Sequence, residues 1–227
     1  MYSSTAVDQM PDQMKAYIIN GNPDGSVNTD HWGRAYSQCT DLGLDCFRSP
    51  SVYVVNNAEY ATACPNYNQA SASKLENFER GCMYAHKNVM DTIAAGEDDR
   101  VLVFEDDINI PASADAARAI MDEELRRTAA DDILFLGNCY NGLCTHAMAV
   151  SKDGADKILN KVKWCEGNWA VDQQLLFLCN TNQLQCSFAA DYPYQYTYDY
   201  PYQYTHGLIR QTEGITLRDS DTMTSNK

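Results

Sequence analysis

The sequence predicts an α/β domain with a mostly parallel central sheet that helices flank. Short apolar runs alternate with longer segments in which apolar residues recur at helical spacing, as in successive strand–helix units. The run VLVF at 101–104 also lacks the alternation of a half-exposed strand. Such a run is typical of a strand that is covered on both faces.

The expected elements follow from these patterns together with turn and capping residues. The first strand is KAYIIN at 15–20, and the turn GNPDGS follows it. Asn28, Thr29 or Asp30 then caps a helix that ends at 42–44. The later elements are strands at 51–58, 100–110, 131–139 and 145–151, and helices at 73–95, 113 or 115 to 127, 152 to about 163, and 171–178.

One domain is expected to span residues 15–210, between an N-terminal extension at 1–14 and a C-terminal tail at 211–227. Within it, 191–206 is a tandem repeat in which DYPYQYTY is followed by DYPYQYTH. Tyrosine occupies every even position from 192 to 204, so in an extended chain the rings would share one face. The prolines favour an edge strand or a polyproline-like arm. The rings either pack on the domain or form a platform for sugar rings or a partner.

The composition excludes several classes of function. The formal net charge is −14, from 31 acidic and 17 basic residues. Such a chain repels phosphate backbones and anionic lipid, so it is not expected to bind nucleic acid. No apolar stretch approaches the ~20 residues of a membrane helix, so stable membrane insertion is not expected either. The N-terminus shows no secretory signal pattern.

The nine cysteines predict a reducing environment. Their number is odd, and no CxxC pair occurs, which gives little support to a structural zinc site. Buried free thiols are therefore expected, and with them a cytoplasmic location.

Three consecutive acids end the strand in VLVFEDDINI: Glu105, Asp106 and Asp107. Ligands of α/β sheets bind at the carboxyl ends of the strands. Carboxylates and substrate phosphates are the ligands that Mg²⁺ and Mn²⁺ prefer, so a cation here could hold a diphosphate on this acidic protein. The alternative is a solvated acidic loop after the strand.

Five segments, taken in order, resemble glycosyltransferases of family 25, which build lipopolysaccharide and collagen glycans, and related viral enzymes. They are KAYIIN (15–20), GCMYAH (81–86), VLVFEDDI (101–108), DILFLG (132–137) and CTHAMAVSKDGADKIL (144–159). The resemblance implies a GT-A fold and a hexosyltransferase that uses Mn²⁺ or Mg²⁺. The implied substrates are a nucleotide-sugar donor, with a UDP-sugar expected, and a glycan or glycoprotein acceptor. It also implies inversion at the transferred sugar.

The resemblance assigns metal and diphosphate roles to the acid motif and to the C-terminal segment. Asp107 would bind the metal directly, Glu105 would contact the ribose or bind the metal through water, and Asp106 would orient its neighbours. GT-A enzymes often take a further metal ligand from a C-terminal loop, for which His206 is the candidate; the alternative is a surface histidine. Arg210 could neutralise the leaving diphosphate.

Further nucleotide contacts follow from the same resemblance. Asn20 and Asn22 would lie near the base and ribose, and Arg34 would reach the diphosphate. Cys82 and His86 lie one helical turn apart and would face the sheet near the acid motif. His86 would make a supporting or donor contact, unless it is a hydrogen-bonded core histidine.

An inverting transferase needs one carboxylate base that deprotonates the acceptor hydroxyl. The first candidate is Asp172 in GNWAVDQQL, close to Trp169 and Trp164, whose indole faces suit sugar rings. The alternative is that Asp172 only favours the start of a helix. Asp191 is the second candidate.

Two other functions are compatible with the sequence. The Tyr-rich arm could belong to a non-catalytic module that binds carbohydrate or protein. Carboxylates after a strand also occur in Mg²⁺-dependent phosphohydrolases.

Overall fold

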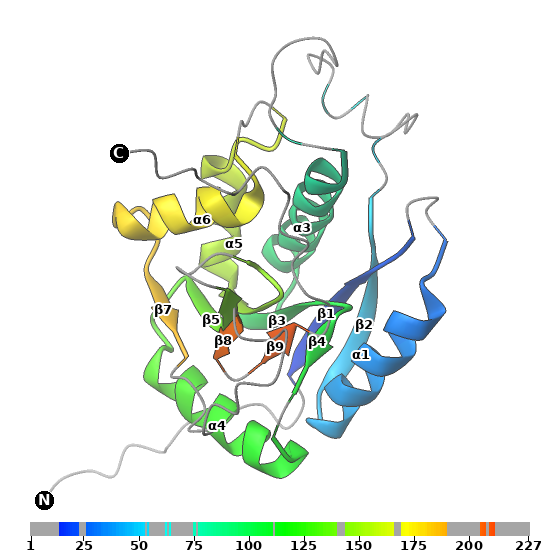
Figure 1. Ribbon diagram of the computed structural model, residues 1–227. Helices are drawn as coiled ribbons and strands as arrows, with labels where there is room; N and C mark the ends of the chain where they lie inside the picture. The colour runs from blue at the N-terminus through cyan, green and yellow to red at the C-terminus, as the bar shows by residue number, and fades with distance from the viewer. Residues whose placement is uncertain are drawn as a thin grey trace, which may run out of the picture.

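A seven-stranded sheet forms the centre of the protein, in the order β2-β1-β3-β6-β5-β7 with β8 paired to β5 (Figure 1). Strands β2, β1, β3, β5 and β7 run in one direction, and β6 and β8 run against them. The predicted α/β architecture with a mostly parallel sheet is thus confirmed. The strands are β1 Lys15–Asn20, β2 Asp45–Pro50, β3 Arg100–Glu105, β5 Ile133–Cys139, β6 Ala147–Ser151, β7 Cys186–Phe188 and β8 Thr205–Gly207.

The computed structural model describes most of the chain between residues 14 and 211. The described residues are 14–22, 26–52, 54, 62, 64, 75, 77–110, 112–139, 144–165, 169–189, 205–207 and 209–211.

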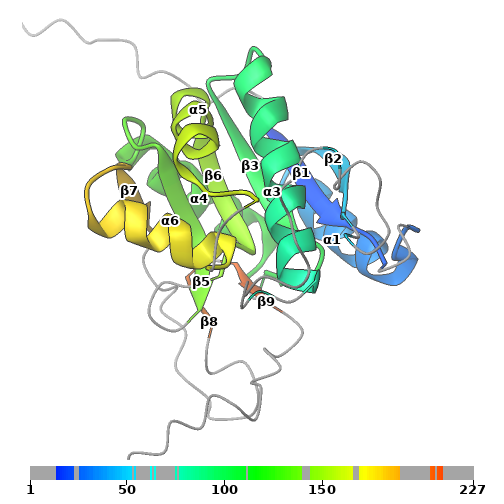
Figure 2. The same cartoon turned by 90° about the horizontal axis from the view of Figure 1, so that it is seen from above.

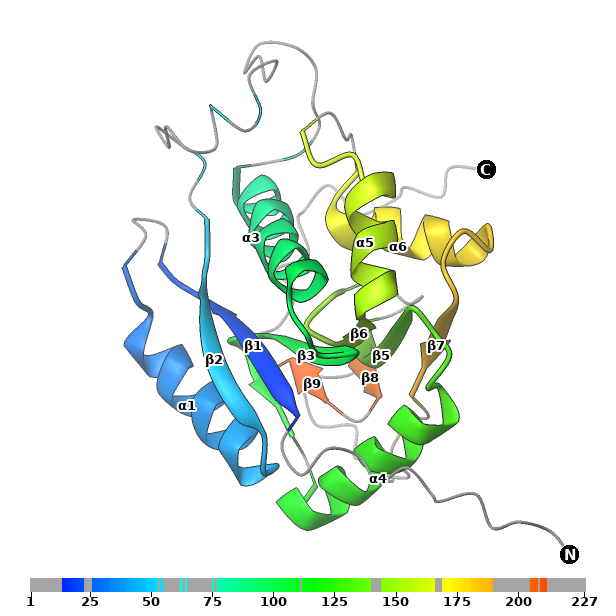
Figure 3. The ribbon, with the colours of Figure 1, turned by 180° about the vertical axis from the view of Figure 1, so that it is seen from behind.

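Helices cover both faces of the sheet (Figures 2 and 3). One layer consists of α3 Asn77–Ala95, α5 Lys152–Lys161 and α6 Val171–Asn180, and the other of α1 Thr29–Asp41 and α4 Ala114–Arg127. Val101 and Val103 of β3 pack with the first layer, whereas Leu102 and Phe104 pack with the second. This two-sided burial explains the uninterrupted apolar run of β3. None of the described helices has the length and apolarity that a membrane span needs.

Side-chain caps start three helices where the sequence predicts. Asn28 accepts a hydrogen bond from the backbone of His31 at the start of α1 (3.3 Å). Ser113 and Ser151 cap α4 and α5 in the same way.

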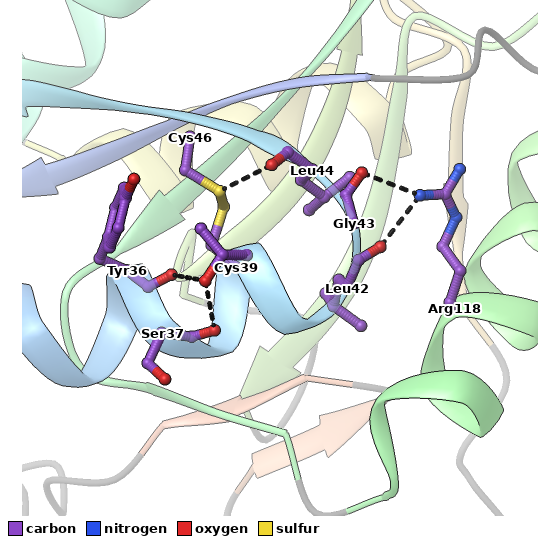
Figure 4. Close-up of a disulfide and its surroundings, with 9 residues drawn as sticks. Tyr36, Ser37, Cys39, Leu42, Gly43, Leu44, Cys46 and Arg118 are labelled. Atoms are coloured by element: carbon purple, nitrogen blue, oxygen red, sulfur yellow. Dashed lines mark hydrogen bonds between the residues drawn. A yellow bond between two sulfur atoms is a disulfide. The ribbon is translucent and has the colours of Figure 1, made fainter.

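The chain reverses after α1 at Gly43, whose φ of +70° lies in the left-handed region that favours glycine. Arg118 of α4 donates hydrogen bonds to the carbonyl oxygens of Leu42 and Gly43 (Figure 4). This contact ties the turn to the helix layer on that face of the sheet.

The second strand does not lie where the sequence predicts. It is β2 at Asp45–Pro50, and none of the described residues of 51–58, which are 51, 52 and 54, belongs to a strand. Strand β2 is the edge strand of the sheet and is only partly buried, so it needs no continuous apolar run. The strand expected at 100–110 is divided into β3 and β4 (Ile108–Asn109) by a turn at 106–107. The short strands β7, β8 and β9 (Arg210–Gln211) were not predicted. Residues 190–204, which hold all the tyrosines of the repeat, lie outside the described residues.

The expectation of free thiols is wrong for most of the cysteines. Each disulfide pair has Cα atoms 5.3–6.3 Å apart, a proximity that the fold creates and that spacing in the sequence does not reveal. Cys144 is also disulfide-bonded, whereas Cys82 is a free thiol. Because disulfides persist mainly in oxidising compartments, the predicted cytoplasmic location loses its basis. The three described pairs are Cys39–Cys46 (Figure 4), Cys64–Cys165 and Cys179–Cys186.

Candidate active site

The acid motif lies at the edge of the sheet where β1, β2 and β3 all end. These strands are parallel, and Ile19 of β1 is in register with Glu105, the last residue of β3. Asp106 and Asp107 form the turn from β3 to β4. Strand β9 pairs with β4 and places the backbone of Arg210 opposite Asn109, so the C-terminal segment lies beside the motif.

A cavity of about 260 Å³ opens at this edge. Its lining includes Asn22 after β1, Ser51 after β2, Cys82 of α3, and two acids of the motif, Glu105 and Asp106. A larger hollow of about 430 Å³ lies beside β7, and none of its described lining belongs to the motif. Since ligands of parallel sheets bind at the carboxyl ends of strands, the smaller cavity is the candidate site.

Asp106 is held by residues of β1 and α1. Its Oδ2 accepts a hydrogen bond from Asn20 Nδ2 at 2.6 Å, and its Oδ1 lies 3.4 Å from His31 Nδ1. Asn20 is buried, and Arg48 of β2 donates to both its side-chain and its backbone oxygen, at 3.1 and 3.0 Å. Asp106 and Asn20 therefore form one hydrogen-bonded unit at this edge of the sheet.

Glu105 points toward α3 and the start of β6. Its Oε1 accepts a hydrogen bond from Thr145 Oγ1 at 3.0 Å and lies 3.6 Å from His86 Nε2 and 3.9 Å from Cys82 Sγ. Burial, together with the charges of Asp172 and Asp106, raises the pKa of Glu105 to about 7, and the hydrogen bond from Thr145 partly opposes this shift. Removal of the Glu105 carboxylate from water, more than repulsion by its neighbours, thus makes a negative charge unfavourable at this position.

This pKa shift predicts how stability depends on pH. Between pH 4.5 and about 7, folded metal-free protein holds a proton on Glu105 that the unfolded chain has released, so this group's contribution to the free energy of unfolding falls as pH rises. The unfolding free energy of the wild type relative to Glu105→Gln should fall by about 3 kcal/mol across this window. Urea unfolding in EDTA at several pH values measures the difference.

A matched control for the loss of a carboxylate is Glu123→Gln, on the exposed side of α4. It should leave the wild-type pH dependence unchanged. A constant difference between wild type and Glu105→Gln across the window would contradict the electrostatic account of Glu105.

Cys82 and His86, one turn apart on α3, face Glu105 together. His86 is fully buried, and burial lowers its pKa. It is not among the described residues that line the cavity, but it contacts two that do, Glu105 and Cys82. Burial, followed by the charges of Glu105, Asp172 and Asp107, raises the pKa of the Cys82 thiol well above its usual range. Cys82 is therefore not an activated nucleophile.

Asp172, the first base candidate, lies in the first turn of α6 and faces the same region. Its Oδ2 accepts a hydrogen bond from the backbone of Cys144 at 3.1 Å, and its Oδ1 accepts one from Gln173 N at 2.7 Å. Its charge acts on Glu105, Cys82 and His86, although 67 residues separate it from Glu105. The fold therefore brings this carboxylate and the acid motif together.

The two tryptophans near Asp172 differ in accessibility. Trp169 is 50% exposed and packs edge-on against Phe177, with ring centroids 5.7 Å apart. Trp164 is buried and donates a hydrogen bond to Leu159 O, so the suggestion that its face binds a sugar is wrong.

The other predicted site residues have different placements. Asn22 lines the cavity, and its amide donates to Ser26 Oγ and Val27 O. Arg34 is exposed on α1 and is not among the described residues that line the cavity. The backbone of His206 pairs with Asn138 in β8–β5, but the side chains of His206 and Arg210 lie outside the description. Asp191 also lies outside it.

Sequence reasoning missed four polar residues around the motif: His31, Arg48, Thr145 and His146. Strand β6 runs antiparallel to β3, so the residues before it lie at the edge where β3 ends. His146 O accepts a hydrogen bond from Glu105 N at 2.9 Å, and its Nε2 donates one to Ile209 O at 2.9 Å. The pair Thr145–His146 directly before an apolar strand was the available signal.

Comparisons with known proteins identify no family. No model of a known protein family matches the chain, and no curated protein does. Three similar solved structures are a CMP:2-keto-3-deoxy-manno-octonic acid synthetase with CTP, the apo glycosyltransferase GlyE of Streptococcus pneumoniae TIGR4, and HddC of Yersinia pseudotuberculosis. Their identities are 7%, 12% and 11%, and their TM-scores are 0.40, 0.37 and 0.39. Each match covers 77% of this chain, and 88%, 45% and 89% of the other chain. At such identities and scores, the likeness says nothing about the activity of this chain.

Proposed function

We propose that the protein is an inverting glycosyltransferase that moves a hexose from a UDP-sugar to a glycan or glycoprotein acceptor. The observation that carries the proposal is the meeting of Glu105, Asp106, Asn22 and Asp172 at one edge of the sheet. The five ordered segments that resemble family 25 supply the reaction class.

The acid motif has the donor chemistry that a hard cation requires. Glu105, Asp106 and Asp107 are consecutive carboxylates, and burial, together with the charges of Asp172 and Asp106, already raises the pKa of Glu105 to about 7. A dication would relieve this repulsion. Asp107 would hold Mn²⁺ or Mg²⁺ directly, with Glu105 and His206 as further candidate ligands. When bound, the cation would stabilise the charge that develops on the leaving diphosphate.

The chain's own residues would position the nucleotide and move one proton. Asn22 and Ser51 form two walls of the cavity, where base and ribose would bind. Asn20, which Arg48 and Asp106 hold in place, would keep the loop after β1 in position. Asp172 would accept the proton of the acceptor hydroxyl as that oxygen attacks the anomeric carbon. The exposed indole of Trp169 offers a face for the acceptor sugar.

The test is to incubate the protein with several nucleotide sugars, with Mn²⁺ or with EDTA. We expect release of the nucleoside diphosphate from a UDP-sugar with Mn²⁺, and none with EDTA. Release of inorganic phosphate would indicate a phosphohydrolase instead. Glycan binding that EDTA does not change, together with no release of nucleotide, would indicate a non-catalytic binding module.

A further inference from the structure

Cys82, His86 and Glu105 place three different metal-ligating groups together behind the cavity. One ligand atom from each residue lies within 4.8 Å of the others. His86 Nε2 is 3.6 Å from Glu105 Oε1, which is 3.9 Å from Cys82 Sγ. These two separations are slightly wider than those between ligands of a tetrahedral zinc ion. Cys82 Sγ lies 3.6 Å from His86 Nδ1, so the side chains must rotate to bring Sγ and Nε2 to one ion.

The hydrogen bonding of His86 leaves one nitrogen free to bind a cation. Its Nδ1 lies 3.0 Å from the carbonyl oxygen of Cys82, which can only accept, so the ring proton belongs on Nδ1. Nε2 then carries a lone pair, is buried, has no hydrogen-bond partner of normal geometry among the described residues, and faces the carboxylate of Glu105. The backbone of Thr145 also lies close enough to the ring to act on its pKa. A metal-binding histidine commonly donates its other N–H to a backbone carbonyl in this way.

Cys82 is an unusual cysteine in this protein. Among the cysteines whose side chains the structure describes, seven are disulfide-bonded, whereas Cys82 keeps its thiol. The carboxylates of Asp107 and Asp172 act electrostatically on it, and their charge also favours a nearby dication. Cys82 and His86 are four positions apart on one helix, and Glu105 follows 19 positions later on a strand. Because this arrangement contains no CxxC pattern, the spacing of the cysteines did not indicate a metal site.

We propose that Cys82, His86 and Glu105 bind a thiophilic divalent cation, for which zinc is the natural candidate. Thiolate and imidazole select zinc, whereas Mg²⁺ and Mn²⁺ prefer oxygen ligands, so this site differs in its ligands from the hard-cation site assigned to Asp107, although Glu105 is a candidate ligand of both. On binding, the Cys82 thiol loses its proton to solvent as the sulfur–metal bond forms. The ion would fix α3 to the end of β3. This inference does not depend on the proposed activity.

Cobalt titration of the metal-free protein tests the proposal, because thiolate bound to Co²⁺ absorbs in the near ultraviolet. We expect a thiolate band that saturates at one Co²⁺ per chain and that zinc abolishes. Cys82→Ser should remove the band, and His86→Asn should weaken Co²⁺ binding at least about tenfold. Asp107→Asn should leave the band intact although it removes Mn²⁺-dependent turnover, so failure here is distinguishable from failure of the proposed function.

A measurement on the wild type avoids any effect of substitution on folding. Bound zinc should slow alkylation of the Cys82 thiol, whereas Mg²⁺ should not. A wild type that shows no thiolate band, or a band that persists in Cys82→Ser, would overturn the proposal. Zinc that leaves the rate of Cys82 alkylation unchanged would overturn it as well.

Discussion

Asp172→Asn is expected to lower sugar transfer roughly 100- to 10,000-fold while nucleotide binding changes little. The amide has the same shape as the carboxylate but only one acceptor oxygen, so it can keep one of the two hydrogen bonds, from Cys144 N or from Gln173 N. It cannot take a proton from the acceptor hydroxyl. Initial rates of transfer and calorimetric affinity for UDP, measured on the same preparations, separate the two effects.

Asp153→Asn is the matched control, because Asp153 occupies the first turn of α5 as Asp172 occupies that of α6. Both changes remove a favourable helix-dipole interaction of about 0.3–1 kcal/mol. Only the Asp172 variant should lose transfer. Equal rates for the two variants would assign Asp172 to the helix alone and leave Asp191 as the base candidate.

Loss of the disulfide Cys64–Cys165 is expected to lower the free energy of unfolding by about 4.7 kcal/mol. The crosslink joins residues 101 positions apart and therefore strongly restricts the unfolded chain. The double variant Cys64→Ala/Cys165→Ala, compared with wild type by urea unfolding, measures the change.

The double variant Cys39→Ala/Cys46→Ala provides the comparison, because this disulfide spans only 7 positions. The same chain-entropy relation gives about 2.5 kcal/mol for it. Loss of the disulfide that closes the longer loop should therefore lower the free energy of unfolding more. A larger loss for Cys39→Ala/Cys46→Ala would show that loop-closure entropy does not govern the stabilisation by these disulfides.

Much of the fold could be predicted because the central strands and their caps are locally encoded. Strand β3 is apolar at four successive positions, since helices cover both its faces. Ser113 and Ser151 are N-caps, and their residue type alone predicts that a helix starts there. Strand β2 escaped prediction because an edge strand is exposed at several positions and has no distinctive pattern.

The site was only partly predictable, for reasons of topology. Glu105 and Asp106 could be placed at a strand end because the acids follow an apolar run directly. Thr145 could not, because its position depends on β6 running antiparallel to β3. The disulfide partners and the contact of Arg48 with Asn20 likewise arise from pairings that local sequence does not encode.

Binding of UDP, measured by calorimetry with and without Mn²⁺, tests the central claim most directly. The wild type should bind UDP with Mn²⁺ and lose the interaction in EDTA, and Asp107→Asn should weaken Mn²⁺-dependent binding at least about tenfold. Asp91→Asn, an exposed α3 carboxylate paired with Lys87, should bind like the wild type. If neither EDTA nor Asp107→Asn changes the affinity for UDP, this would contradict the claim that a cation at the end of β3 binds the diphosphate.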